Sequence, residues 1–219
     1  MSKKAWFLIA FFVLLVVGFY YGLTAVIPGF GKKELPVLSY IQPFSFSNQE
    51  GKTITEKDVL DRVYVAEYFF TTCKGICPKM NRNMQEIYEK YKDEADFRIL
   101  SHTVDPETDT VARMKWYADS LKADPSVWWF LTGAKDSLYN AARNSYLLDD
   151  PKNSKTPIDE QFLHTQFFAL VDRDGRVRKI YDGLKKNELE DLEDDIAKLL
   201  KAPHSKGRFS NSLFTNNPN

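Results

Sequence analysis

The chain has only two cysteines among its 219 residues, and they stand close together as Cys73 and Cys77. Because a third cysteine is missing, a metal ion bound by this pair needs another type of ligand. Cysteines four positions apart can close a small disulfide, or both can turn their sulfurs toward one metal ion. A disulfide with a purely structural role is an alternative, although so short a loop removes little entropy from the unfolded chain.

An excess of positive charge is also missing, since 30 basic residues balance 30 acidic ones. This balance gives no electrostatic footprint for nucleic acid, and we expect no nucleic-acid partner. The polar stretch 203–219, rich in Asn and Ser, has too few apolar residues to build a core and is predicted to be disordered.

Residues 5–27 contain no charged side chain, and a helix of this length crosses a bilayer. The segment therefore predicts a transmembrane anchor, with 1–4, including Lys3 and Lys4, in the cytoplasm. No small-x-small cleavage site follows, and no cysteine lies near for lipid attachment. We expect an uncleaved single-pass anchor in a bacterial inner membrane, with the domain in the periplasm, where disulfides persist. A cleaved signal peptide is the alternative.

Beyond the anchor, the sequence predicts a linker over 28–43 and one globular domain over 44–202. Apolar periodicity and turn signals divide this domain into a hairpin, five strands and four helices. In chain order these are the hairpin 44–55, strand 63–70, helix 78–92, strand 97–104, helix 108–122, strand 127–131, helix 135–147, strands 166–171 and 177–181, and helix 186–201. Crossover helices followed by a late hairpin indicate an α/β fold, a thioredoxin-like mixed sheet with flanking helices. The polar stretch 149–160 is expected to be a surface excursion.

The cysteine pair falls where a strand leads into a helix. At such a helix N-terminus, unpaired backbone N–H groups and the helix dipole stabilise a thiolate, and Lys74 adds a positive charge. We expect at least one cysteine with a lowered pKa, able to bind a soft cation or to attack a disulfide.

Three histidines are available as a further ligand. His164 precedes a strand that should run antiparallel to the one ending at Phe70, which places it at the same sheet edge as the cysteines. It is the expected third ligand. Strand alternation places His102 with Leu100 and Val104, so we expect it to be buried or behind the site, and His204 lies in the polar tail.

Two thiolates and one imidazole suit Cu(I) and Cu(II), whereas a structural zinc site usually has a fourth protein ligand. Copper is therefore the expected metal. Met80 and Met84 offer thioethers, but their spacing is that of the core face of a helix, and we expect them in the core.

Other chemistries lack a required residue. A peroxiredoxin has Pro and Thr where this chain has Ala66 and Phe70. The segment 172–175 opens like a calcium loop but has no closing Glu, so we interpret it as a turn. The three carboxylates within 105–109 are explained by helix capping, with Thr108 or Asp109 as the cap.

Three motifs together resemble the Sco/SenC family of membrane-anchored copper proteins, within the thioredoxin superfamily. They are Phe-Thr-Thr-Cys-Lys-Gly-Ile-Cys-Pro at 70–78, Thr-Val-Asp-Pro-Glu-Thr-Asp-Thr at 103–110, and His164-Thr165 ahead of a strand. The resemblance runs from about residue 44 to residue 201 and implies copper held by Cys73, Cys77 and His164. One departure is Leu163, where family members commonly have an Asp that accepts a hydrogen bond near the site.

The resemblance also implies a role in assembling the binuclear copper centre of cytochrome c oxidase subunit II, through copper delivery, thiol reduction or both. The expected partners are that subunit or another copper-centre apoprotein, and a thiol reductant protein. We expect a metallochaperone without turnover. A thiol-disulfide oxidoreductase, in which Cys73 and Cys77 form a disulfide, and a copper or redox sensor remain as alternatives.

Overall fold

The computed structural model describes residues 3–26, 35–163 and 165–203, and the chain divides into two compact units. In the first unit, helix α1 (Lys3–Val26) confirms that the uncharged run is helical. By length and composition, residues 3–23 are sufficient to cross a membrane. The predicted anchor function and the cytoplasmic position of residues 1–4 remain predictions.

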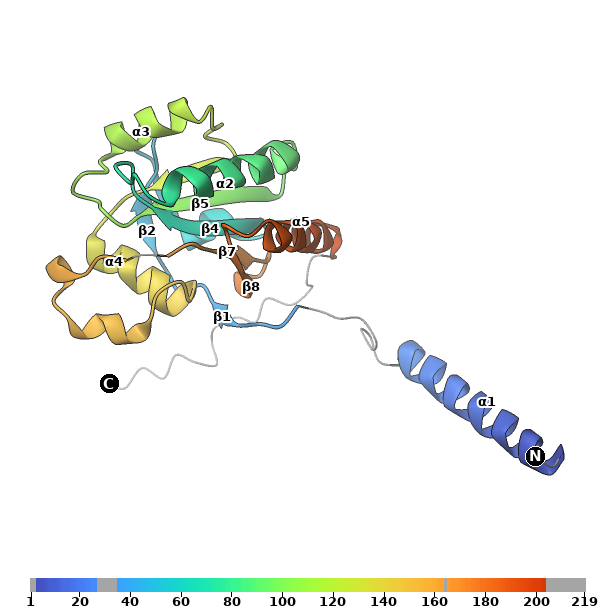
Figure 1. The fold of residues 1–219 in the computed structure, drawn as a ribbon. Coiled ribbons are helices and arrows are strands. Elements are labelled where there is room, and N and C mark those ends of the chain that lie inside the picture. Colours follow the sequence, from blue (N-terminus) through green and yellow to red (C-terminus); the bar gives the residue numbers. More distant parts are fainter. Residues whose placement is uncertain (1–2, 27–34, 164, 204–219) are drawn as a thin grey trace, which may run out of the picture. The chain divides into compact units, whose positions relative to one another are not determined.

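The second unit begins at Val37 and is built around a six-stranded mixed sheet, shown in Figure 1. The strand order is β1-β8-β7-β4-β5-β6. The strands are β1 (Ser39–Tyr40), β4 (Val63–Phe69), β5 (Phe97–Thr103), β6 (Trp128–Leu131), β7 (Phe167–Val171) and β8 (Arg176–Asp182). A separate hairpin consists of β2 (Ser45–Ser47) and β3 (Thr53–Thr55).

Strands β4, β5 and β6 are parallel, whereas β7 and β8 run antiparallel to their neighbours. The helices are α2 (Cys77–Tyr91), α3 (Val111–Ser120), α4 (Lys135–Asn140) and α5 (Lys186–Lys201), with a π-helical turn at Ala141–Ser145 after α4. Short 3-10 helices cover Glu56–Val59, Pro151–Lys155 and Ile158–Glu160. The predicted mixed α/β sheet with flanking helices is therefore confirmed.

The central strand β4 is buried at every position, which explains its nearly unbroken apolar sequence. Alternate side chains enter different layers. On one face, Phe69 packs against Tyr117 of α3, with ring centroids 5.3 Å apart. On the other face, the Tyr68 hydroxyl donates a 2.9 Å hydrogen bond to the Leu138 carbonyl of α4. Helices thus cover both faces of the sheet.

Two predicted segments differ in the structure. Residues 39–40 of the expected linker form edge strand β1, because Ser39 pairs with Val177 of β8. The predicted helix 135–147 is α-helical only to Asn140 and then widens into the π-helical turn. His204 and nearly all of the predicted tail lie outside the described residues, as does the first part of the linker, 28–34.

The cap of α3 is a further correction. Thr110, not Thr108 or Asp109, is the N-cap, and its hydroxyl accepts a hydrogen bond from the Arg113 backbone N–H. The carboxylate of Asp109 has other partners, because it is turned into the protein.

Candidate metal and thiol site

The two cysteines lie on the loop that joins β4 to α2. Cys77 is the first residue of the helix and is 5% exposed, whereas Cys73 is half-buried in the preceding loop. The Cys73 backbone N–H closes a turn onto the Phe70 carbonyl at 3.2 Å. Both sulfurs are free thiols, so the structure shows the reduced pair.

Their surroundings give the two thiols opposite acidities. Burial acts to raise the pKa of the Cys73 thiol, but hydrogen bonds from Cys77 and from the N–H groups of Gly75 and Ile76 lower it overall. Burial, and the nearby Cys73, raise the pKa of Cys77 to about 12. The pair thus consists of one accessible, acidic thiol and one buried, protonated thiol.

We therefore expect iodoacetamide at pH 7 to modify Cys73 at least about tenfold faster than Cys77, because the thiolate is the nucleophile. Mass spectrometry of the full chain in detergent, quenched at successive times, measures both rates. The Cys77→Ser variant is the control, and its rate profile reports Cys73 alone. Faster modification of Cys77 would contradict the asymmetry.

A buried carboxyl group, Glu67 on β4, lies close enough to the pair to raise the pKa of Cys77. Its Oε1 accepts a 2.6 Å hydrogen bond from Ser101, whose Oγ in turn accepts one from the Trp128 indole at 2.8 Å. Burial raises the pKa of Glu67 to about 7. The sequence signal for this group was its position as the one charged residue in the apolar run 63–70.

The histidine side of the site depends on β7. This strand is antiparallel to β4, as predicted, with Ala169 opposite Ala66, so it begins at the edge where β4 ends. His164 lies outside the described residues. Among those described, no cluster of three His, Cys, Asp or Glu side chains forms a metal site. His164 as third ligand therefore stays a prediction.

The described neighbours of His164 nevertheless approach the cysteine loop. Phe162 packs edge-on against Phe70, with ring centroids 5.1 Å apart. Phe70 is three residues before Cys73, and Phe162 is two residues before His164. The two segments that carry the predicted ligands are thus in contact.

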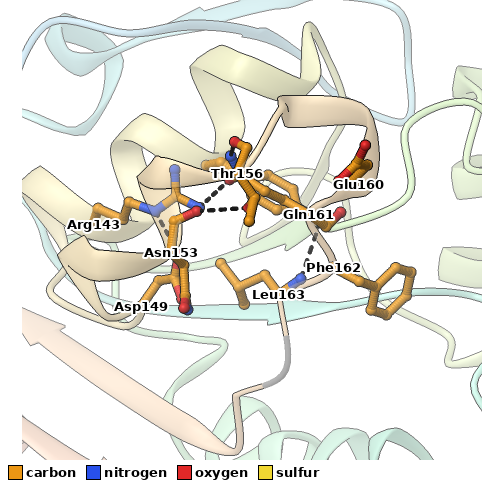
Figure 2. A pocket seen from close by; sticks show the side chains of 9 residues that line it. Arg143, Asp149, Asn153, Thr156, Glu160, Gln161, Phe162 and Leu163 are labelled. Carbon is orange, nitrogen blue, oxygen red and sulfur yellow. Dashed lines mark hydrogen bonds and ion pairs between the residues drawn. The ribbon is translucent and has the colours of Figure 1, made fainter.

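The segment leading to His164 is fixed by Arg143, as Figure 2 shows. Its guanidinium donates to Asp149, at the start of the surface excursion, at 2.6 Å, and also to Gln161, just after its end. The Leu163 backbone N–H donates to the Tyr139 hydroxyl at 3.1 Å. These groups line a cleft of ≈ 220 Å³ beneath the excursion.

Leu163 itself is buried in the hydrophobic core. At the position where the family resemblance led us to expect an Asp, this chain therefore has an apolar side chain that packs in the core. His102 is also fully buried, as predicted, and its ring packs on Tyr68 and Tyr146, which belong to the hydrophobic cluster that contains Leu100 and Val104. Burial lowers its pKa to about 4. His102 stacks on Tyr68, its cross-strand neighbour on β4. Tyr68 directly follows Glu67, and consecutive side chains of a strand point to opposite faces, so His102 and Glu67 lie on opposite faces of the sheet.

Met80 and Met84 are fully buried on α2, which confirms their core role. Asp109 is the second functional candidate that sequence reasoning missed. Its carboxylate is fully buried and accepts hydrogen bonds from Thr71 and Thr103. A buried carboxylate that bonds the cysteine loop is not explained by capping.

Comparison with known proteins agrees with this geometry. The family model described as SCO1/SenC matches residues 33–201. A SCO1 protein homolog from Bacillus subtilis is 33% identical over 171 residues, which cover 76% of this chain and 86% of that protein. The chain spans about half the length of the mitochondrial SCO1 relatives from Arabidopsis thaliana and Saccharomyces cerevisiae.

Two solved structures are informative. BsSco, described as a member of the Sco family of cytochrome c oxidase assembly proteins with a disulfide switch, is 31% identical, with a TM-score of 0.65 over 78% of this chain and 100% of that one. ScoI of Bradyrhizobium japonicum, solved with copper bound, is 25% identical, with a TM-score of 0.57 over 74% of this chain and 99% of that one.

Proposed function

Because the chain belongs to the SCO1/SenC family, we propose that it is a membrane-anchored copper-binding protein that assists assembly of the binuclear copper centre of cytochrome c oxidase. The observation that carries the proposal is the reduced pair Cys73 and Cys77, whose sulfurs are within hydrogen-bonding reach of each other at a helix N-terminus. The copper-bound and disulfide-switch relatives support it.

The residues fit copper by their chemistry. Two sulfurs are soft donors, and an imidazole from His164 would complete a set of three. Binding a cation displaces the protons of both thiols, so the affinity decreases as the pH decreases. The high pKa of Cys77 makes this thiol the main source of that dependence.

A second function, thiol-disulfide exchange, is favoured by the unequal acidities of the two thiols. The Cys73 thiolate would attack a partner disulfide and release one partner thiol. Cys77 would then lose its proton and attack the Cys73 sulfur, which releases the second partner thiol. The partner gains two electrons, the chain keeps a Cys73–Cys77 disulfide, and a thiol reductant protein restores the pair.

The deciding experiment is copper binding by the full chain in detergent. We expect one copper per chain, with affinity reduced about tenfold or more in His164→Ala and further reduced in Cys73→Ser, because each loses a donor. The tail variant His204→Ala is the matched control and should bind like the wild type. If His164→Ala leaves the affinity and the spectrum unchanged, the three-ligand site is wrong.

A wild-type chain that binds copper weakly but reduces a disulfide in a copper-centre apoprotein would favour the second function. We further propose cytochrome c oxidase subunit II as the recipient, and α1 as a single-pass anchor in a bacterial inner membrane with the domain in the periplasm. The length and composition of α1 support the anchor.

A further inference from the structure

The carboxylate of Asp109 is the best-bonded acidic group near the cysteine loop. It is fully buried between β5 and α3, and its oxygens accept hydrogen bonds from three donor groups on two threonines. The Thr103 hydroxyl donates at 2.6 Å, the Thr71 hydroxyl at 2.5 Å and the Thr71 backbone N–H at 3.1 Å. Burial of a carboxylate is costly unless such bonds compensate it.

Thr71 donates two of these hydrogen bonds and lies two residues before Cys73. Its hydroxyl donates to Asp109 and also accepts a 3.0 Å hydrogen bond from Nε of Arg113. Arg113 is itself placed over the Trp116 ring, 4.6 Å from its centroid. The cysteine loop is therefore tied through one residue to the β5–α3 connection and to α3.

Besides these bonds, the loop before Cys73 is held by the packing of Phe70 on Phe162. Within it, the Cys73 backbone N–H closes only a turn, onto Phe70. Cys77, by contrast, is fixed because it begins a helix, in which the N–H groups of Lys79 and Met80 bond the Ile76 carbonyl. The separation of the two sulfurs thus depends on how the Cys73 end of the loop is held, by Thr71 on one side and by hydrogen bonds from Gly75, Ile76 and Cys77 to the Cys73 thiol on the other.

We propose that Asp109 is a positioning residue for the thiol pair, because through Thr71 it holds the loop that carries Cys73 beside Cys77. It touches neither sulfur in any contact of the described structure, so its action is on loop geometry. The inference deepens the proposed function, since copper binding and disulfide formation both require two sulfurs at a fixed separation.

The test is the equilibrium of the full chain in detergent with glutathione. Each oxidised glutathione that closes the Cys73–Cys77 disulfide takes up two hydrogens with two electrons and leaves as two reduced molecules. We expect Asp109→Ala to lower this equilibrium constant about tenfold, and Thr71→Val about threefold, the size of a lost net hydrogen bond. The double variant should lose less than the product of the two factors.

Asp195→Asn is the matched control, because this buried carboxylate on α5 accepts hydrogen bonds from Tyr181 and Lys198 and not from the cysteine loop. Its constant should equal that of the wild type. Equal losses in both carboxylate variants, or an unchanged constant in Asp109→Ala, would overturn the proposal. Should Asp109→Ala fail to fold, half-buried Thr71→Val decides, and an unchanged constant there also overturns it.

Copper titration of the same proteins separates this inference from the proposed function. If the wild type binds no copper while Asp109→Ala still lowers the glutathione constant, the copper function fails and the positioning role stands. If the wild type binds copper and the Asp109→Ala constant is unchanged, the function stands and the positioning role fails.

Discussion

Replacing Arg143 with Met will lower the free energy of unfolding by about 3 to 5 kcal/mol, because it leaves the buried carboxylate of Asp149 without its cation, with only the neutral Asn153 amide as a donor. The two side chains are only 9% and 6% exposed, and they are joined at 2.6 Å. The same guanidinium bonds Gln161 and lies over the Tyr139 ring, 5.6 Å from its centroid. One substitution therefore releases both ends of the surface excursion. Urea unfolding of the full chain in detergent measures the loss.

The double variant Arg143→Met, Asp149→Leu should recover most of that stability, because replacing both charges removes the uncompensated one. Lys186→Met is the control, since Lys186 and Glu190 form an exposed pair, 91% and 67% accessible, whose loss should cost about 1 kcal/mol or less. A double variant no more stable than the single variant would show that the ionic contact is not the source of the effect.

The sheet could be predicted because its signals are local. The buried run at β4, the helical spacing of Met80 and Met84, and the turn ending at Gly175, with φ of +71°, each identify an element within a few residues. Connection rules then order the strands, and they placed β7 antiparallel beside β4. For this reason the approach of the His164 segment to the cysteines was predictable.

Side-chain partners from separate loops were not predictable in this way. Thr108, Asp109 and Thr110 are all suitable helix caps, and the choice of Thr110 is fixed by the bonds of Asp109 to Thr71, 38 residues away. The partners of Arg143 likewise lie 6 and 18 residues away and meet it only through the conformation of the excursion. Such pairs depend on loop conformation, which has no period in the sequence.

Glu67 and His102 will affect stability in opposite directions as the pH changes. The pKa of Glu67 is raised from 4.5 to about 7, so its contribution is fully present below pH 4.5 and is lost as the pH rises through 7. The pKa of His102 is lowered from 6.5 to about 4, so its contribution is present above pH 6.5 and is lost as the pH falls through 4. Each amounts to about 3 kcal/mol, and between pH 4.5 and 6.5 they largely cancel.

Replacing either residue should therefore leave the pH-dependent contribution of the other to stability uncompensated. Relative to the wild type, Glu67→Gln should gain about 3 kcal/mol of unfolding free energy between pH 4.5 and 7, since only the unfavourable ionisation of Glu67 is removed. Relative to the wild type, His102→Phe should gain a similar amount as the pH falls from 6.5 to 4, since the variant lacks the imidazole that is protonated in the unfolded chain but stays neutral in the folded one. Urea unfolding of the copper-free full chain across this range measures both differences.

The difference between variant and wild type is the decisive quantity, because surface carboxylates titrate equally in both proteins and cancel from it. Glu67 and His102 lie on opposite faces of the sheet, so their contributions should add in the double variant. A Glu67→Gln curve parallel to the wild type would mean that the pKa of the carboxyl is not raised in the folded protein, because solvation or a partner compensates its burial. In that case Glu67 would hold a negative charge behind Cys77 throughout the physiological range, and the high pKa of that thiol would depend on charge repulsion as well as on burial.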